Sequence, residues 1–152
     1  MNLKLLEAEL RRDEGVRYTP YVDTTGHRTI GVGRNMDATP IPKGWTFPLT
    51  DAQVDELLAD DIQTACGGLD RFLPWWRNLD EVRQRVVCNL AFNMGIGTLL
   101  TFRNTLTDMK QGFYTAAATG MRASLWARQV GQRAQRLADA MASGVMPDEP
   151  TI

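Results

Sequence analysis

The sequence predicts an α+β fold that is mostly α-helical, and three observations lead to this class. The chain opens with leucines at helical spacing, changes between residues 17 and 35 to turn and strand residues, and then shows helical periodicity through most of its remaining length. Its 152 residues, 43% of them hydrophobic and 23% charged, suit a single globular domain. We therefore expect one small sheet near the N-terminus and helices in the rest of the chain.

The first element is a helix expected over residues 2–13. Leu3, Leu6 and Leu10 follow an i, i+3, i+7 spacing, which places them in one apolar stripe. Gly15 follows the helix, and glycine adopts the left-handed conformation of a helix end at little cost. Acidic side chains stand where a secretory signal would have its apolar core, so we expect synthesis in the cytosol.

A small sheet is expected next. The segment from Tyr18 to Val32 combines tyrosine, threonine, isoleucine and valine with the turn sequence Thr24-Thr25-Gly26. This pattern predicts an antiparallel hairpin or a three-stranded sheet. Residues 37–50 contain three prolines and a glycine, so they should form an irregular loop that joins the sheet to the next helix.

Helical patterns fill the rest of the chain. Thr50 and Gln53 form a capping box ahead of a helix over residues 51–65, which the pair Gly67-Gly68 is expected to end. Residues 80–94 have the most apolar helical pattern and should lie at the centre of the larger lobe. Further helices are expected over residues 102–111, 114–121 and 129–143.

Two tryptophans lie between the first two of these helices. Trp75 and Trp76 either pack into the core or stack on sugar rings, and core packing is favoured because such rings carry large buried areas. Two cysteines, Cys66 and Cys88, are expected to be buried free thiols, with a disulfide as the alternative. With a single histidine, His27, and scattered carboxylates, no metal-ligand spacing occurs, so we expect no metal and no cofactor.

The charge is unevenly distributed along the chain. Residues 1–61 hold seven basic and eleven acidic residues (7 − 11 = −4), whereas residues 62–152 hold ten and seven (10 − 7 = +3). A basic C-terminal part favours a polyanionic partner, either nucleic acid or an anionic cell-wall polymer, and a solvated basic face is the alternative. No apolar run approaches the roughly 18 residues that a membrane span requires.

Candidate catalytic residues lie close together near the N-terminus. Glu14 is expected at the C-terminal end of the first helix, where the dipole and apolar neighbours disfavour its anion and keep a proton available. Asp23 lies beside the predicted turn, in a wetter place, and should be ionised. Thr29 offers a hydroxyl that can orient a water molecule. Two carboxyl groups in unlike surroundings are typical of glycoside hydrolysis.

The spacing of these residues resembles a known family signature. The string Glu-x8-Asp-x5-Thr, with Gly15 after the glutamate and Ile-Gly-Val-Gly after the threonine, resembles that of bacteriophage-type lysozymes, glycoside hydrolase family 24. Residues 89–106 (NLAFNMGIGTLLTFRNTL) look like the central helix of this family, and residues 124–144 (SLWARQVGQRAQRLADAMASG) look like its closing segment. The resemblance runs from about residue 3 to residue 144.

This resemblance implies a phage-lysozyme fold, with a small N-terminal sheet lobe and a larger helical lobe joined by a long helix. The whole chain, 1–152, would be one catalytic domain: residues 14–65 form the small lobe with the connecting helix, and residues 1–13 and 66–152 form the helical lobe. The glycan would lie between the lobes. Glu14 would be the general acid, Asp23 the base or charge stabiliser, and Thr29 the residue that positions water.

Substrate-binding positions are also implied by the resemblance. Asn35 follows the glycine-rich hairpin, Phe92 matches an aromatic residue that faces the cleft, and Thr105 matches a small hydroxyl residue of the large lobe. Phe92 could instead belong to the core, and Thr105 could instead cap a helix. Arg34 stands where many members have histidine, a change that would exchange one structural ion-pair partner for another.

Other features depart from the family or invite a role. His27 lies between the second acid and the threonine, and an exposed turn histidine is the favoured interpretation. Gly120 stands where some members present an asparagine to the glycan, so that contact should be lost.

The expected function is that of an endolysin. It would hydrolyse the β-1,4 bond between N-acetylmuramic acid and N-acetylglucosamine in peptidoglycan, with inversion and with the two carboxyl groups about 6.5–9.5 Å apart. We expect a monomer that binds glycan strands and neither nucleic acid nor membranes. It would reside in the host cytoplasm and reach the wall through a holin-type pore. The alternatives are a catalytically inactive glycan-binding protein on the same fold, a lytic transglycosylase and a secreted antibacterial effector.

Overall fold

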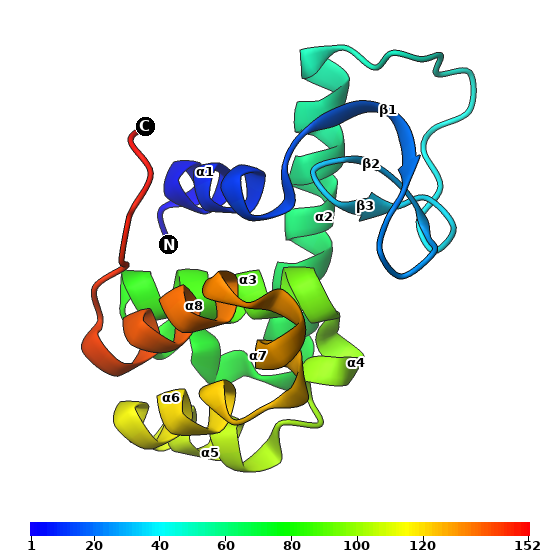
Figure 1. Ribbon diagram of the computed structural model, residues 1–152. Coiled ribbons are helices and arrows are strands. Elements are labelled where there is room, and N and C mark those ends of the chain that lie inside the picture. Colours follow the sequence, from blue (N-terminus) through cyan, green and yellow to red (C-terminus); the bar gives the residue numbers. More distant parts are fainter.

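The computed structural model describes residues 1–152 and has two lobes connected by one long helix (Figure 1). A three-stranded sheet lies beside one end of helix α2, and most of the remaining helices gather around its other end. The predicted α+β, mostly α class is confirmed. The elements are α1 (Leu3–Glu14), β1 (Arg17–Val22), β2 (Arg28–Gly31), β3 (Arg34–Asn35), α2 (Asp51–Phe72), the 3-10 helix η1 (Pro74–Asn78), α3 (Glu81–Met94), α4 (Ile96–Leu99), α5 (Arg103–Gln111), α6 (Tyr114–Arg122), α7 (Leu125–Val130) and α8 (Gln132–Ser143).

The first helix agrees with its predicted span and differs in its apolar face. Leu6 and Leu10 are fully buried, but Leu3 is 48% exposed, so its predicted place in the buried stripe is wrong. The side chain of Asn2 accepts a hydrogen bond from the backbone N–H of Leu5, which makes Asn2 the N-cap. Position 3 therefore lies in the first, outward-facing turn rather than in the core.

The sheet is antiparallel with the strand order β1-β2-β3. Thr29 of β2 lies opposite Tyr21 of β1 and opposite Asn35 of β3, so the central strand carries this threonine between its two neighbours. The register of β1 shifts between Arg17 and Tyr21. Pro20 lies within that shift, as is usual for proline on an edge strand, because it lacks the N–H that a ladder needs. Of the two predicted arrangements, the three-stranded sheet is the one formed.

The connecting helix α2 is longer than the sequence predicts. The capping box of Thr50 and Gln53 is present, but the helix continues through Gly67-Gly68 to Phe72. A Cβ atom at position 68 would come within 3.0 Å of the Cβ atom of Ile96, so glycine here lets α4 approach the helix closely. The helix ends two residues before Pro74, because a residue that precedes proline avoids the helical conformation.

Helix α3 lies at the centre of the larger lobe, as predicted. Its residues 85–91 are all buried, and they join a core cluster to which every long helix contributes. Trp76 is fully buried and donates a 2.8 Å hydrogen bond from Nε1 to Asp70, so core packing is confirmed for this tryptophan, while Trp75 is partly exposed.

The C-terminal helical region is divided more finely than predicted. The single helix expected over residues 129–143 is two helices, α7 and α8, which meet at Gly131 with a φ of 60°. The short helix α4 was not predicted at all. No helix of this structure combines the length and the apolar character that crossing a bilayer requires.

Candidate active site

Glu14 is the last residue of α1, at the point where the chain passes from the helix into the sheet. The turn is made by Gly15, whose φ of 73° is in the left-handed region that favours glycine. The backbone N–H of Gly15 still bonds to the carbonyl of Arg11, so the helix is complete up to Glu14. The carboxyl group of Glu14 is thereby fixed on a regular element rather than on a mobile loop.

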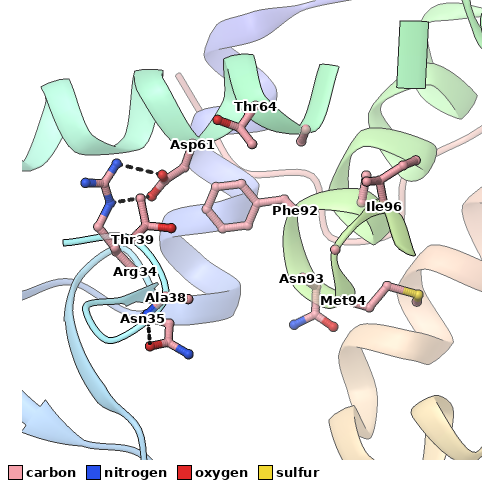
Figure 2. Close-up of a pocket in the computed structure, with 14 residues that line it drawn as sticks. Arg34, Asn35, Ala38, Thr39, Asp61, Thr64, Phe92, Asn93, Met94 and Ile96 are labelled. Carbon is pink, nitrogen blue, oxygen red and sulfur yellow. Dashed lines mark hydrogen bonds and ion pairs between the residues drawn. The ribbon is translucent and has the colours of Figure 1, made fainter. Parts of the chain in front are cut away.

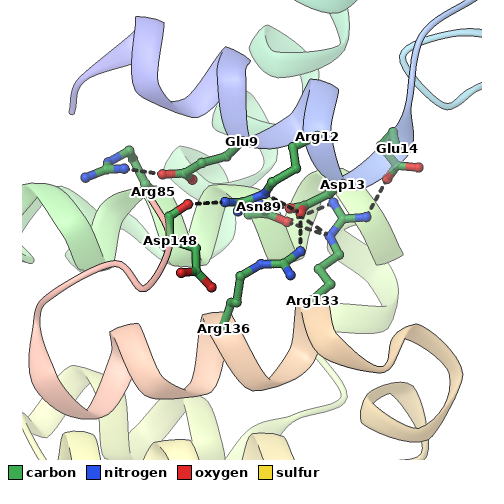
Figure 3. Close-up of polar contacts among 9 residues, drawn as sticks. All are labelled: Glu9, Arg12, Asp13, Glu14, Arg85, Asn89, Arg133, Arg136 and Asp148. Carbon is green, nitrogen blue, oxygen red and sulfur yellow. Dashed lines mark hydrogen bonds and ion pairs between the residues drawn. The ribbon is translucent and has the colours of Figure 1, made fainter. Parts of the chain in front are cut away.

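The carboxyl group of Glu14 meets two side chains from the helical lobe. Arg133 of α8 places Nη1 2.6 Å from Oε1 (Figure 3). Asn93 of α3 places Nδ2 3.5 Å from the same oxygen. Asn93 is held in turn by Trp126, whose Nε1 donates a 2.6 Å bond to its Oδ1. The second oxygen, Oε2, has no hydrogen-bond partner in the protein. One oxygen of Glu14 is therefore fixed and the other is available to a ligand.

The neighbouring residue, Asp13, holds Arg133 in place. The side chain of Asp13 is 1% exposed and accepts a 2.7 Å bond from Arg136, while one of its oxygens lies 3.4 Å from Nε of Arg133. Asn89 of α3 accepts from Nε and Nη2 of Arg133 at 3.0 and 2.8 Å (Figure 3). Because two buried groups, Asp13 and Asn89, fix this guanidinium, it can hold Glu14 in one position.

The backbone of the sheet lobe approaches Glu14 from the other side. A Cβ atom at Gly33 would lie 2.6 Å from Oε2 of Glu14, closer than van der Waals contact allows. Gly33 also has a φ of 70°, so both its conformation and its surroundings require glycine. The glycine-rich turn between β2 and β3 therefore packs directly against the carboxyl group of Glu14.

A cavity of about 400 Å³ opens beside this group, between the lobes (Figure 2). Its wall combines the turn before β3 with one face of α2 and the C-terminal end of α3, and Gly33 and Asn93, both in contact with Glu14, belong to it. Side chains that line it and are labelled in Figure 2 are Arg34, Asn35, Ala38, Thr39, Asp61, Thr64, Phe92, Asn93, Met94 and Ile96. A mixed polar and apolar hollow of this size is suited to a small polar ligand such as a sugar ring.

Asp23 lies at the end of β1, where the turn to β2 begins. Its Oδ1 accepts three hydrogen bonds, from the backbone N–H of Thr25 and of His27, both at 2.9 Å, and from the hydroxyl of Thr25 at 2.7 Å. The His27 N–H and the Thr25 hydroxyl lower the pKa of Asp23 below its usual range, because they stabilise the anion. Its Oδ2 has no partner within the protein. Asp23 is thus an ionised carboxylate with one free oxygen.

Thr29 and His27 have different surroundings on the same hairpin. Thr29 is 4% exposed and donates a 3.1 Å hydrogen bond from its hydroxyl to the carbonyl oxygen of His27. The imidazole of His27 is exposed, with Nδ1 4.0 Å from an oxygen of Asp37, as predicted for a turn histidine. What His27 contributes is its backbone: the N–H bonds to Asp23, and the carbonyl accepts from Thr29.

The three predicted substrate-binding residues lie in different places. Phe92 and Asn35 line the cavity, on opposite lobes. Oδ1 of Asn35 already accepts from the backbone N–H groups of residues 37 and 38, at 2.9 and 3.1 Å, which leaves its amide nitrogen for a ligand. Thr105 is outside the cavity wall and 8% exposed, and a Cβ atom at Gly120 would lie 2.4 Å from its hydroxyl oxygen.

Arg34 forms an ion pair with Asp61, which ties β3 to α2. Its Nη2 and Nε lie 2.7 and 3.1 Å from the two oxygens of that carboxylate (Figure 2). This two-pronged geometry is the one that the planar guanidinium favours. The sequence-based expectation that Arg34 takes a structural ion-pair position is confirmed. The pair also forms part of the cavity wall, so it shapes the hollow from the sheet side.

The basic excess of the C-terminal part is largely used inside the molecule. Six of its ten basic residues form ion pairs with carboxylates: Arg77, Arg83, Arg85, Arg122, Arg133 and Arg136. The basic face that was expected to attract a polyanion is therefore weaker than the count of charges implies. The physical reason is that the guanidinium group pairs with carboxylates of the same chain as readily as with an anionic ligand.

Two residues that hold the site were missed by the sequence analysis. Arg133 lies 119 positions from Glu14 in the chain, and Asn93 lies 79 positions from it. The available signal was the spacing of Arg133 and Arg136 three residues apart, which places them on one face of an apolar helix. Arginines on such a face need buried partners, and the adjacent acids at positions 13 and 14 supply them.

The unlike surroundings of the two carboxyl groups are typical of one class of protein. Glu14 lies beside a cavity with one oxygen fixed by an arginine, and Asp23 is an anchored carboxylate on the adjoining hairpin. Two acids made unlike by their environments are the means by which glycoside hydrolases protonate a leaving oxygen and assist the attack on the sugar.

Comparison with known proteins agrees with this class. The family described as phage lysozyme matches residues 11–141, and the chain belongs to this family of glycoside hydrolases, as its motifs predict.

Individual relatives place the chain in two settings. It is 30% identical over 94% of its length to the pre-baseplate central spike protein Gp5 of Enterobacteria phage T4, of which it spans 28%. It is 26% identical over 90% of its length to probable T4-type lysozyme 1 of Dictyostelium discoideum, of which it spans 93%. It is 35% identical to the endolysin of Salmonella phage P22 over 57% of its own length and 58% of that protein. The chain thus resembles both a lysozyme of about its own length and part of a longer phage protein.

Proposed function

We propose that this chain hydrolyses the β-1,4 bond between N-acetylmuramic acid and N-acetylglucosamine in peptidoglycan. The observation that carries the proposal is the position of Glu14. Its carboxyl group lies against Gly33 and Asn93, which both line the interlobe cavity, with Oε1 2.6 Å from Arg133 and with Oε2 free of hydrogen-bond partners in the protein. Membership of the phage lysozyme family supports lysozyme-type cleavage of this polymer.

In this mechanism Glu14 is the general acid. It gives its proton to the glycosidic oxygen as the bond to the sugar breaks, and the carboxylate that results needs a compensating charge. Arg133 provides that charge from a fixed position, because Asn89 and Asp13 hold its guanidinium before the reaction begins. A donor fixed in advance does not have to reorganise as charge develops, and this lowers the barrier.

Asp23 acts in its ionised form, as the base that activates water or as the charge that stabilises the developing oxocarbenium ion. The hydrogen bonds to Oδ1 fix its orientation and leave Oδ2 for the water molecule or the sugar. The hydroxyl of Thr29 would take part in positioning that water, and Phe92 and Asn35 would contact the sugar from the cavity wall. Thr105 lies outside the cavity wall, so it would contact only a glycan strand that extends beyond the cavity.

We further propose inversion of the anomeric centre and a role in lysis of the host cell. The protein would act as a monomer on glycan strands, would bind neither nucleic acid nor membranes, and would pass from the host cytoplasm to the wall through a holin-type pore. The match to a P22 endolysin supports a lytic role, and the match to a central spike protein marks a phage structural protein as a second context for the same chemistry.

The test compares Glu14→Gln with the wild type. The amide has the shape of the acid and cannot donate a proton in the same way, so turnover should fall by about two orders of magnitude or more. The assay is the clearing of outer-membrane-permeabilised Gram-negative cells. Glu56→Gln is the matched control, because Glu56 is an exposed glutamate of α2 without a hydrogen bond or ion pair. Full activity of Glu14→Gln would exclude Glu14 as the acid.

Product analysis separates this function from its alternatives. Mass spectrometry of digested muropeptides should show reducing ends, whereas a lytic transglycosylase leaves anhydro ends. Proton NMR recorded in the first minutes of the reaction should show the α anomer first, as inversion requires. A wild-type protein that binds glycan strands without cleaving them would instead establish the inactive glycan-binding alternative.

A further inference from the structure

Two thiols face each other where helices α2 and α3 pack together. Sγ of Cys66 lies 3.7 Å from Sγ of Cys88, within reach of a weak S–H···S hydrogen bond. Cys88 is fully buried, but Cys66 is only partly buried, which differs from the expectation of two buried thiols. One sulfur of the pair can therefore be reached from solvent, while the other is held against it by the core.

The charges around the pair make the two thiols unlike. The hydrogen bond from Cys88, together with the positive charge of Arg77, lowers the pKa of Cys66 below its usual range despite partial desolvation. The same contact and burial raise the pKa of Cys88. Thiolate rather than thiol is the nucleophile in cysteine chemistry, so Cys66 is the sulfur that reacts first.

We propose that Cys66 and Cys88 are a site of oxidative modification, at which a peroxide converts the two thiols into an intramolecular disulfide. The Cys66 thiolate attacks one peroxide oxygen, the O–O bond breaks, and Cys66 becomes a sulfenic acid. The departing hydroxide takes up the proton that the Cys66 thiol had released and leaves as water. Sγ of Cys88 then attacks Sγ of Cys66, and the S–O bond breaks. The departing hydroxide takes the Cys88 proton and leaves as a second water. Two thiols are oxidised by two electrons, and one hydrogen peroxide is reduced to two water molecules.

The geometry requires little movement for this step. A disulfide has its sulfurs about 2.05 Å apart, so the two atoms have about 1.7 Å left to close. The link would join α2 to α3 across the chain between residues 66 and 88, which includes all of η1. Both helices also line the interlobe cavity, through Ala65 beside one cysteine and Phe92 one turn beyond the other. The disulfide would therefore fix the packing directly beneath the cavity wall.

Stability is the property that the link should change. A disulfide restricts the unfolded chain more than the folded one, and its effect grows with the length of the closed loop. For a loop of this length in a chain of this size, oxidation should raise Tm by about 5–10 °C, and dithiothreitol should reverse the change.

The experiment treats the folded wild type with hydrogen peroxide and then digests it with trypsin under non-reducing conditions. Trypsin releases residues 44–71 and 86–103 as separate peptides, each with one of the two cysteines. After oxidation these peptides should appear as one linked species that lacks two hydrogens. Cys66→Ser is the control, because it removes the reachable sulfur and reports what peroxide does to the seven methionines. Its Tm should not rise on oxidation.

Several results would overturn the proposal. The two peptides could remain separate with sulfinic acid on Cys66, or a non-reducing gel could show a covalent dimer in place of an internal link. Both would mean that Cys88 does not capture the oxidised sulfur. A linked species whose Tm equals that of the reduced protein would reject the stabilising role. These readouts use no glycan substrate, so they are independent of the proposed hydrolase activity.

Discussion

Two glutamates on the same helix each meet an arginine, and their surroundings make one pair structural and the other functional. Glu9 and Glu14 are both on α1, and their partners Arg85 and Arg133 come from the helical lobe. Glu9 is fully buried, whereas the side chain of Glu14 is 20% exposed and lies against Gly33 and Asn93 of the cavity wall. The comparison teaches that two glutamate–arginine pairs on one helix can have different roles, depending on whether a ligand can reach the glutamate.

The Glu9 pair is the centre of a larger tie. Arg85 also contacts Glu81, at 2.7 Å, and Glu149 of the C-terminal segment, at 2.6 Å (compare Figure 3 for the Glu9 contact). It thereby connects α1, α3 and the end of the chain. Burial raises the pKa of Glu9 to about 7 even though Arg85 opposes this change, and its Oε2 is buried without a partner. Glu9 thus helps to hold these elements together, although burying its carboxyl group costs free energy of folding.

The largest expected effect is that of Arg85→Met. Removing the cation leaves Glu9 buried without its partner, and breaking a buried pair in this way costs about 3–5 kcal/mol of the free energy of unfolding. Urea denaturation followed by circular dichroism measures the loss. Because Arg85 does not contact the cavity, the activity of each folded molecule should be retained at a temperature where the variant is folded.

Arg133→Met makes the same change in the other pair and tests whether the two pairs differ in function. It also removes a buried arginine, but this one contacts Glu14, so the activity per folded molecule should fall along with stability. The double variant Glu9→Gln with Arg85→Met should recover part of the stability lost in Arg85→Met, because no unpaired charge is then buried. Equal losses of specific activity in Arg85→Met and Arg133→Met would show that the two pairs are not distinct in function.

The next effect concerns the wall beside Glu14. Gly33→Ala must adopt a positive φ and must also place a Cβ atom 2.6 Å from Oε2 of Glu14. The conformation alone costs about 1–2 kcal/mol, and displacement of the carboxyl group should lower turnover by at least about tenfold. Turnover on permeabilised cells and Tm measure the two parts separately.

Gly26→Ala isolates the conformational part of that effect. Gly26 has a φ of 87°, but a Cβ atom there would meet no atom within 4 Å. Its Tm should therefore fall by an amount similar to that of Gly33→Ala, with turnover close to wild type. If Gly26→Ala lost as much turnover as Gly33→Ala, strain in the hairpin rather than contact with Glu14 would explain both.

The fold was predictable where it depends on residues close together in the sequence. It was less predictable where it depends on contacts between residues far apart in the sequence. The capping box at Thr50 and the strand-forming residues before Val32 act over a few positions, and both predictions are confirmed. Gly67-Gly68 was expected to end a helix, because glycine weakens isolated helices. In the folded chain the close packing of Ile96 against Gly68 outweighs that local preference. The residues around Gly68 do not predict this packing.

The site divides in the same way. Glu14, Asp23 and Thr29 fall within sixteen consecutive residues, so one motif identifies all three. The anchoring of Asp23 by Thr25 is equally local. Arg133, by contrast, reaches Glu14 only because α8 packs against α3 beneath α1, and this depends on the whole larger lobe. Sequence motifs therefore gave the candidate reacting groups, whereas the residues that orient them required the structure.

The last expected effect is a pH dependence of stability that distinguishes Glu9 from exposed glutamates. Its pKa is about 7 in the folded protein and 4.5 as the ordinary value. Between these values the folded state holds a proton that the unfolded state has released, so the free energy of unfolding falls as the pH rises from about 4.5 to 7. Below this window both states are protonated, and above it both are ionised.

Glu9→Gln removes this contribution, because the amide does not titrate. The difference in unfolding free energy between wild type and Glu9→Gln should therefore fall as the pH rises through the window and be level outside it. Urea titrations at pH 4, 5, 6, 7 and 8 measure it, with Glu56→Gln as the control at an exposed glutamate. A difference that rises with pH would mean that the attraction of Arg85 outweighs burial. Only access to the cavity would then separate the Glu9 pair from the Glu14 pair.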